Sequence, residues 1–368
     1  MLHRLVPFFV LAAWLPAEAP KLRLGDDVRP LRYRLDLTLI PEGDTFSGRV
    51  EIDLEVRKAA GTVWLNARGL SFDEAKFTRE GRAMAAKVET SGKEFAGFSP
   101  KTELPPGRAK LEIAYHGEFN KKGSDGLFKQ EEGGASYVFT QFESIDARQA
   151  FPCFDEPNFK VPWQVTLHVP ARDSALSNTP IVSETGEADG RKKVVFAETK
   201  PLPSYLVAVA AGPFEFVDGG KAGKNGTSLR VVTPRGKATQ AKYAAEVSGQ
   251  LLEQLESYFG VAYPYEKLDL LAVPLFGGAM ENAGLITCAQ SLLLADPAQD
   301  SIGRQRGYAE VMAHEMAHQW FGDLVTTAWW DDIWLNEAFA RARRLGLPSR
   351  AAGSAPAMHR ARRPLRRN

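Results

Sequence analysis

The N-terminal part of the chain alternates apolar and polar positions with a period of two. Four segments show the alternation most clearly, at residues 33–39, 50–56, 111–115 and 163–169. This period is typical of strands with one buried face, and turns rich in Gly and Pro, such as Pro105-Pro106-Gly107, separate the segments. No apolar stripe of helical length interrupts them. The pattern predicts an antiparallel β domain over residues 20–215.

Beyond residue 216 the period of the apolar positions changes to about four. Residues 217–226 (VDGGKAGKNG) are rich in Gly and Lys and predict a linker or exposed loop. An apolar residue then recurs every fourth position from Tyr243 to Phe259, which predicts an amphipathic helix that ends at Gly260. The remaining elements that we expect are a strand at 268–273, an extended segment at 277–286 and a helix at 303–321. The fold class is therefore α+β in two domains, the second over residues 216–340.

Composition adds a charge asymmetry to this picture. The 368 residues suffice for two hydrophobic cores, and the net charge is +1. Residues 341–368 hold nine arginines and no acidic residue. Residues 1–340 therefore contain 37 basic and 45 acidic residues. A mildly acidic body gives no sign of a nucleic-acid surface, so we expect no nucleic-acid partner. Cys153 and Cys288 are too few and too far apart for a disulfide framework, and we expect two small buried side chains.

The first nineteen residues resemble a secretion signal. His3 and Arg4 precede an apolar run over residues 5–15, and Ala17-Glu18-Ala19 has the form of a cleavage site. The run is too short to span a bilayer stably, so we expect export to the periplasm or the extracellular space and no stable transmembrane helix. Two alternatives stay open: an uncleaved membrane anchor, or a mobile apolar terminus of a cytoplasmic protein.

The arginine-rich segment at residues 341–368 has no apolar period. We interpret it as an aberrant, disordered tail, produced by a frameshift or truncation of a longer gene. The alternative is a basic arm that binds anionic membranes or nucleic acid.

The strongest chemical signal is His314-Glu315-Met316-Ala317-His318, followed by Glu337. On a helix, residues four apart lie on one face, so His314 and His318 can direct their rings at one point. Glu315 is placed to reach a water at that point, and Glu337 can add a ligand from a following helix. Two His, one carboxylate and an open position are typical of a catalytic zinc site, whereas structural zinc sites use four protein ligands. We therefore predict one Zn²⁺ per chain.

The alternative to a zinc site is a surface helix with solvated His and Glu side chains. The apolar neighbours Met312, Ala317 and Trp320 favour a buried helix face instead. A buried His needs a polar partner or a metal ion.

Three stretches of sequence extend this signal. They are HEMAHQWFGDLVT with WWDDIWLNEAFA (314–326 and 329–340), Gly278-Ala279-Met280-Glu281-Asn282, and TQFE, DAR and FPCFDEP between residues 140 and 157. In these stretches the chain resembles the zinc aminopeptidases related to aminopeptidase N, within the gluzincin metallopeptidases. The resemblance runs from about residue 30 to residue 340. It implies that the second domain is the first part of a thermolysin-like catalytic domain and that the chain is truncated at its C-terminus.

The resemblance also implies how a substrate is bound. Gly278, Ala279, Met280, Glu281 and Asn282 match the exopeptidase motif of that family. If this segment is an edge strand, it can pair with the substrate backbone, and Glu281 can bind the substrate α-ammonium group. Glu143, with Gln141 beside it, matches a second carboxylate that the family supplies from its β domain. Two acids around one ammonium group imply peptide substrates with a free N-terminus.

The function implied is zinc-dependent removal of N-terminal residues by an activated water, with Glu315 as the base. The family's oxyanion-stabilising tyrosine lies on a later segment, residues 341–368 contain no Tyr, and Tyr308 is expected to be a packing residue. Truncation can therefore impair the activity. The alternative function is a non-catalytic zinc- or peptide-binding fragment, and an endopeptidase is a third option. No feature predicts an oligomeric state.

Overall fold

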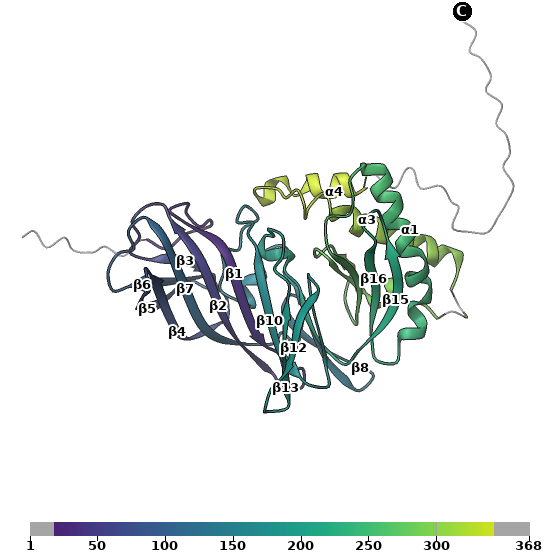
Figure 1. Ribbon diagram of the computed structural model, residues 1–368, viewed down its shortest axis with the longest axis horizontal. Coiled ribbons are helices and arrows are strands. Elements are labelled where there is room, and N and C mark those ends of the chain that lie inside the picture. The colour runs from purple at the N-terminus through teal and green to yellow at the C-terminus, as the bar shows by residue number, and fades with distance from the viewer. Residues whose placement is uncertain (1–17, 297, 299, 342–368) are drawn as a thin grey trace, which may run out of the picture.

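A computed structural model describes residues 18–296, 298 and 300–341 of the chain (Figure 1). The signal-like segment predicted over residues 1–19 lies outside the described residues except for its last two positions. The predicted tail over 341–368 also lies outside them except for its first residue. Among the described residues, no helix has the length and apolar character needed to cross a membrane.

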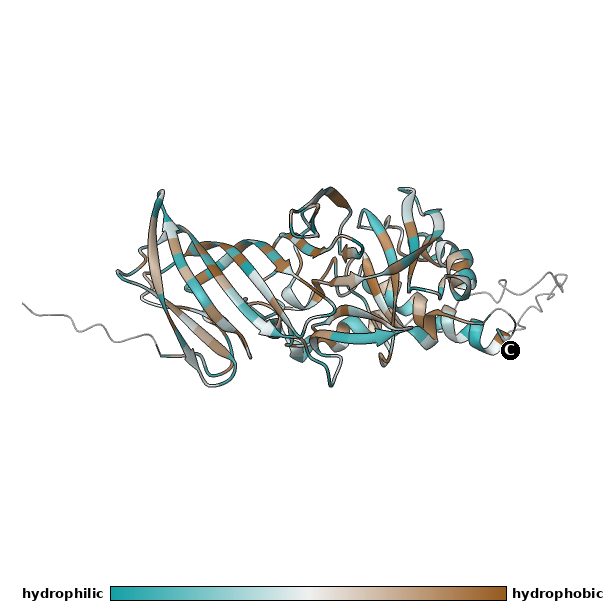
Figure 2. Cartoon of the chain, turned by 90° about the horizontal axis from the view of Figure 1, so that it is seen from below, coloured by the Kyte–Doolittle hydropathy of each residue, from teal (hydrophilic) through white to brown (hydrophobic). Residues whose placement is uncertain are grey.

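The N-terminal part is built on a ten-stranded sheet with the order β12-β13-β10-β1-β2-β7-β4-β5-β6-β3 (Figure 1). The bounds are β1 Val28–Thr38, β2 Thr45–Val56, β3 Val63–Asn66, β4 Ser71–Arg79, β5 Arg82–Ser91, β6 Phe95–Pro100, β7 Gly107–Glu118, β10 Trp163–Pro170, β12 Ile181–Gly186 and β13 Arg191–Phe196. The four strands predicted from the alternation are confirmed as β1, β2, β7 and β10. Figure 2 shows the alternation as apolar and polar bands along these strands. All neighbours are antiparallel except β1 and β10, so the predicted antiparallel domain contains one parallel pair.

A second, four-stranded antiparallel sheet has the order β11-β14-β9-β8. Its strands are β8 Gly126–Glu132, β9 Ala135–Gln141, β11 Ser174–Ser177 and β14 Val209–Gly212. Two short 3-10 helices, η1 Ala147–Gln149 and η2 Ser204–Leu206, lie in the connections of this part of the chain. Strand β9 matters for the site because the chain leaves it directly into the loop that carries Glu143.

The C-terminal part holds a five-stranded sheet with the order β15-β16-β17-β19-β18, packed with helices α1 and α3 (Figure 1). Its elements are β15 Phe214–Ala222, β16 Thr227–Pro234, β17 Lys267–Val273, β18 Ala279–Met280, β19 Leu285–Ala289, η3 Ala238–Ala241, α1 Lys242–Phe259, α2 Gln290–Leu293, α3 Ile302–His318, η4 Trp330–Asp332 and α4 Trp334–Arg341. Strands β16, β17 and β19 are parallel, and β15 and β18 are the antiparallel edges. The predicted amphipathic helix is confirmed as α1, and Gly260 ends it with a φ of +72°.

The linker predicted at residues 217–226 is wrong, because most of it belongs to β15. This strand pairs antiparallel with β16, and its register shifts between Asp218 and Lys221. Gly219 lies so close to Leu229 that an added Cβ would be 2.2 Å from that side chain. The glycines that suggested a loop therefore accommodate a bulge and a close strand contact. The chain turns only at Gly223–Gly226, where Gly226 N–H donates to the Gly223 carbonyl oxygen.

The hydrophobic core runs from one part of the chain into the other without a break. Trp163 stacks on Tyr33 in the N-terminal part, with ring centroids 3.8 Å apart. Cys153 and Cys288 are both buried and not disulfide-bonded, which confirms the expectation for them. A shared core gives the two parts a fixed relative position, and the candidate site uses residues from both.

Candidate active site

Helix α3 carries both histidines and ends at the second one. Ser301 caps its first turn by accepting a hydrogen bond from the backbone N–H of Arg304 at 3.2 Å. The helix was predicted to reach Phe321, but regular helix stops at His318. The chain then turns through Gly322, whose φ of +133° favours glycine and whose added Cβ would lie 3.3 Å from His318 Nδ1. This early turn brings the backbone that follows the helix back against the His318 ring.

His314 and His318 converge as the sequence predicted. Their Nε2 atoms are 3.1 Å apart, and the rings meet edge to face. His318 is buried, with its Nδ1 atom 3.0 Å from the carbonyl oxygen of Phe321. This contact favours the tautomer that carries its proton on Nδ1, which leaves a lone pair on Nε2. His318 can therefore present an Nε2 lone pair to a metal ion, and His314 Nε2 points at the same place.

Glu337 reaches the same point from helix α4. Its carboxylate oxygens lie 3.5 Å from His314 Nε2 and 3.9 Å from His318 Nε2. One ligand atom from each of the three residues falls within 4.8 Å of the others. Four ligands at about 2.0–2.2 Å around a tetrahedral Zn²⁺ are separated from one another by about 3.3–3.6 Å. The two nitrogens and one carboxylate therefore fit a zinc ion in kind and in spacing.

Aromatic contacts hold α4 against the rest of the protein. Phe339 stacks on Phe321 at 4.8 Å, and Trp330, just before α4, packs edge-on against Tyr205 at 5.1 Å. The other face of this region is exposed and apolar, with Trp334 59% and Val325 64% exposed. The position of Glu337 thus depends on a helix that is packed on one side only within the described residues.

Several carboxylates lie close to the two histidines. Burial raises the pKa of Glu315 well above its usual value, and the charges of Glu281, Glu337 and Glu143 raise it further. Burial, followed by the charges of Glu281 and Glu337, raises the pKa of Glu143 to about 8. Burial is also the main cause that raises the pKa of Glu281 to about 7. Glu281 and Glu315 are buried and Glu143 and Glu337 are half-buried, and acids grouped in this way are stable as anions only when a positive charge joins them.

The exopeptidase-like segment is an edge strand, but a very short one. Only Ala279 and Met280 form β18, which pairs antiparallel with Cys288 and Thr287 of β19. Gly278 has a φ of +104° and open space where a Cβ would be, so a glycine is required there for backbone reasons. The edge position is therefore confirmed, whereas the extended segment expected over 277–286 is interrupted after Met280.

Glu281 and Asn282 leave the strand and are buried, with exposures of 5% and 1%. A Glu281 carboxylate oxygen lies 3.9 Å from His318 Nδ1, so this side chain reaches the metal-ligand cluster. Asn282 instead donates to the Thr287 hydroxyl at 3.3 Å and braces the turn. Of this pair, Glu281 is the residue placed to contact a ligand.

Gln319 is a residue that the sequence analysis missed. Its side chain donates to the Glu281 carbonyl oxygen at 2.7 Å and accepts from the Gly284 N–H at 3.0 Å and the Tyr263 hydroxyl at 3.2 Å. It therefore joins the turn after α3 to the segment that carries Glu281. The only signal in the sequence was a polar residue four positions after Glu315 on the same buried face.

Glu143 comes from the loop after β9, in the N-terminal part. Its carboxyl group is half-buried, and the charges of Glu281 and Glu337 help to raise its pKa, so it lies within electrostatic range of these acids. Gln141 is the last residue of β9, and its buried side-chain oxygen has no hydrogen-bond partner among the described residues. The assignment of Glu143 and Gln141 to substrate binding therefore stays a prediction.

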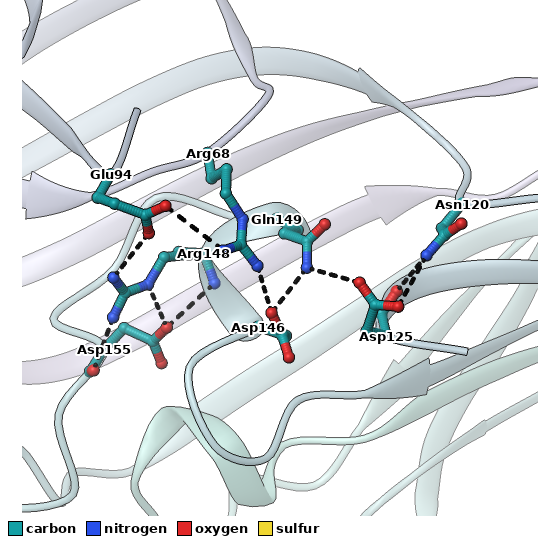
Figure 3. Close-up of polar contacts among 8 residues, drawn as sticks. All are labelled: Arg68, Glu94, Asn120, Asp125, Asp146, Arg148, Gln149 and Asp155. Carbon is teal, nitrogen blue, oxygen red and sulfur yellow. Dashed lines mark hydrogen bonds and ion pairs between the residues drawn. The ribbon is translucent and has the colours of Figure 1, made fainter. Parts of the chain in front are cut away.

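A polar network holds the far end of the Glu143 loop (Figure 3). Asp146 accepts hydrogen bonds from Arg68 and from Gln149, the latter at 2.8 Å. Next to it, Arg148 Nε donates to the buried carboxylate of Asp155 at 2.8 Å. These contacts hold the loop against the large sheet, so the backbone that carries Glu143 has a fixed position.

The Asp155 carboxylate extends the network towards η2. It also accepts from the Ser204 hydroxyl at 2.6 Å, while Asn66 accepts from the Asp155 N–H at 3.1 Å.

Tyr308 on helix α3 is buried, and its hydroxyl lies 2.5 Å from that of Ser248, which confirms it as a packing residue.

Comparisons with known proteins agree with this arrangement. The family described as Peptidase M1 N-terminal domain matches residues 29–206, and the Peptidase family M1 domain matches residues 243–358. The chain is 36% identical to a puromycin-sensitive aminopeptidase of Caenorhabditis elegans over 92% of its own length and 37% of that protein. It is 39% identical to aminopeptidase M1 of Arabidopsis thaliana over 86% of its own length and 37% of that protein.

A bacterial relative is similar over its whole length. The protein named aminopeptidase N from Acetobacter pasteurianus is 34% identical over 92% of this chain and 99% of that protein. The chain thus spans little more than a third of the two eukaryotic relatives and nearly all of the bacterial one.

Proposed function

The chain belongs to peptidase family M1, and from this premise we propose that it is a zinc-dependent aminopeptidase that removes the N-terminal residue of peptides. The observation that carries the proposal is the convergence of His314 Nε2, His318 Nε2 and the Glu337 carboxylate beside the buried Glu281. His314, His318 and Glu337 would hold the zinc ion. When bound, zinc supplies a Lewis acid that polarises a carbonyl group and makes water more acidic.

The acidic residues around the metal ligands would transfer protons and bind the substrate. Glu315, one residue after His314, accepts a proton from the attacking water and returns it to the leaving amine. Glu281 and Glu143 bind the α-ammonium group of the substrate, which supplies the positive charge that their raised pKa values call for. The edge strand β18 offers main-chain groups to the substrate backbone, so the first peptide bond is the one aligned with the zinc ligands.

The test is hydrolysis of an aminoacyl anilide and of its N-acetylated counterpart by the purified chain. We expect release from the free amine, at least tenfold less from the acetylated form, and loss of release in Glu315→Gln. Bound zinc without release, unchanged by Glu315→Gln, would assign the chain to zinc binding without catalysis. Equal cleavage of both substrates would point to an endopeptidase and contradict the proposal.

A further inference from the structure

Lys160 of the N-terminal part reaches across to the turn that follows the zinc-ligand helix. Its Nζ atom lies 2.6 Å from the Asp323 carbonyl oxygen, 2.8 Å from the Leu324 carbonyl oxygen and 2.9 Å from the Thr326 hydroxyl. An ammonium group has three N–H donors, so these three acceptors satisfy it completely. Every partner lies more than 160 residues away along the chain.

The turn that Lys160 holds is itself closed by hydrogen bonds. Gly322 N–H donates to the Val325 carbonyl oxygen at 2.8 Å, and the Thr326 hydroxyl donates to the Gly322 carbonyl oxygen at 2.7 Å. Asp323 N–H donates back to the His318 carbonyl oxygen at 3.0 Å. The same turn begins at Phe321, whose carbonyl oxygen contacts His318 Nδ1. The contacts therefore run without a gap from Lys160 to the ring of a metal ligand.

The backbone on both sides of Lys160 is held in place by its neighbours. The next residue, Val161, exchanges two backbone hydrogen bonds with Leu202, at 2.9 and 3.2 Å, and the preceding residue, Phe159, packs on Phe154. The bridge to Leu202 is two residues from η2, which carries Tyr205 and through it touches Trp330 before α4. The lysine is thus fixed on the side of the protein that also supplies Glu143.

Charge adds a second reason for a lysine at this position. Asp323 is fully buried, and neither of its carboxylate oxygens has a hydrogen-bond partner among the described residues. Burial and the charge of Glu281 raise the pKa of Asp323, and the positive charge of Lys160 opposes them. A neutral side chain at position 160 would remove the positive charge that offsets this acid.

We infer that Lys160 is a positioning residue for the metal centre: it fixes the turn that orients His318 and couples that turn to the part of the chain that carries Glu143. This inference rests on the proposed zinc site for its functional consequence. The contacts of Lys160 with residues 323–326, which we call the clamp, exist in the metal-free chain and can be measured without zinc.

The first measurement is amide hydrogen exchange of residues 322–326 in the metal-free protein. We expect Lys160→Met to raise the exchange rates at Gly322 and Asp323, whose N–H groups donate within the turn, at least tenfold, and Lys160→Arg, which keeps the charge and N–H donors, to restore part of the protection. The matched control is Lys129→Met, because Lys129 Nζ also donates to a main-chain carbonyl, that of Gly43 at 2.9 Å, in the N-terminal part. The control should leave residues 322–326 unchanged.

The second measurement is the zinc dissociation constant by competition with a chelator. Loss of a group that hydrogen-bonds a metal ligand typically weakens metal binding by about 10–100-fold. Lys160 acts through the turn and contacts no ligand itself, so we expect a weakening towards the lower end of that range, about tenfold, for Lys160→Met. Lys129→Met should stay within threefold of the parent. If the parent binds no zinc, the proposed function fails, while the exchange data still decide on the clamp.

A folded Lys160→Met protein with unchanged exchange at 322–326 and an unchanged dissociation constant would overturn the inference, even if its global stability fell. If Lys160→Met does not fold, Lys160→Gln replaces it, because it removes the charge and keeps a shorter side chain with two N–H donors, while the hydrogen bonds within the turn stay intact. That variant should show the same two effects, each smaller. Their absence would equally overturn the inference.

Discussion

Gln319 offers the sharpest test of how the candidate site is held together. We consider Gln319→Leu, which keeps a side chain of similar size but removes its amide. The Glu281 carbonyl oxygen and the Gly284 N–H lose their partner. The Tyr263 hydroxyl keeps a partner because it also donates to the Lys267 carbonyl oxygen at 3.1 Å. Two buried main-chain groups are therefore left without a hydrogen bond.

The expected loss of stability follows from these two groups. A buried polar group without a partner costs about 1–3 kcal/mol, so Gln319→Leu should lower the free energy of unfolding by about 2–6 kcal/mol. The assay is urea unfolding of the metal-free protein, followed by circular dichroism. The matched control is Gln164→Leu, since Gln164 also donates its amide to a main-chain carbonyl, that of Phe196, in the N-terminal part. Only one partly buried acceptor is affected there, so the loss should be about 0.5–1.5 kcal/mol.

The functional readout separates Gln319 from a residue that merely packs. If it fixes Glu281 relative to α3, the preference for a free over an acetylated N-terminus should fall at least tenfold in Gln319→Leu and stay unchanged in Gln164→Leu. A stability loss below about 1 kcal/mol, with the preference intact, would refute the role given to these hydrogen bonds.

Three further predictions concern the acids. Glu281→Gln and Glu143→Gln should each lower kcat/KM for a free N-terminus about 10–100-fold, the size of one charge-assisted hydrogen bond of about 1.5–3 kcal/mol, and leave an acetylated substrate unaffected. The pKa of Glu143 is raised in the folded chain to about 8, so the folded state holds a proton that the unfolded state releases above its ordinary value of 4.5. Stability of the metal-free protein should therefore fall as pH rises from 5 to 8, and urea unfolding should show a smaller fall in Glu143→Gln; parallel curves would contradict this. Asp155→Asn breaks the buried pair with Arg148 and should cost about 3–5 kcal/mol of unfolding free energy, against less than about 1 kcal/mol for Asp26→Asn in the exposed pair with Arg29.

The sequence predicted the elements whose pattern is local. The alternation of apolar and polar residues predicts strands β1, β2, β7 and β10. The four-residue apolar period and Gly260 predict helix α1. The ligands His314 and His318 were equally accessible, because one helical turn fixes their separation. Strand β15 was not predicted, because Gly219 and its neighbours are rich in Gly and Lys, as loops often are. Their pairing with β16, a contact between separate segments, makes them a strand.

Contacts between distant segments could not be derived from local patterns. Lys160 and Gln319 are ordinary polar residues in the sequence, and their importance comes from partners 163 and 38 residues away. The parallel pairing of β1 with β10 is of the same kind. Glu143 was identified only through a resemblance, since nothing in the sequence around it indicates that its charge acts on Glu281 and Glu337.

The claim at the centre of this account is that His314, His318 and Glu337 hold one zinc ion. The direct measurement is zinc content by mass spectrometry of the purified chain after dialysis against trace zinc, beside His318→Ala, Glu337→Gln and Glu315→Gln. We predict one zinc per chain in the parent and in Glu315→Gln, and clearly less in the two ligand variants. Zinc content in the parent no higher than in His318→Ala would contradict the account.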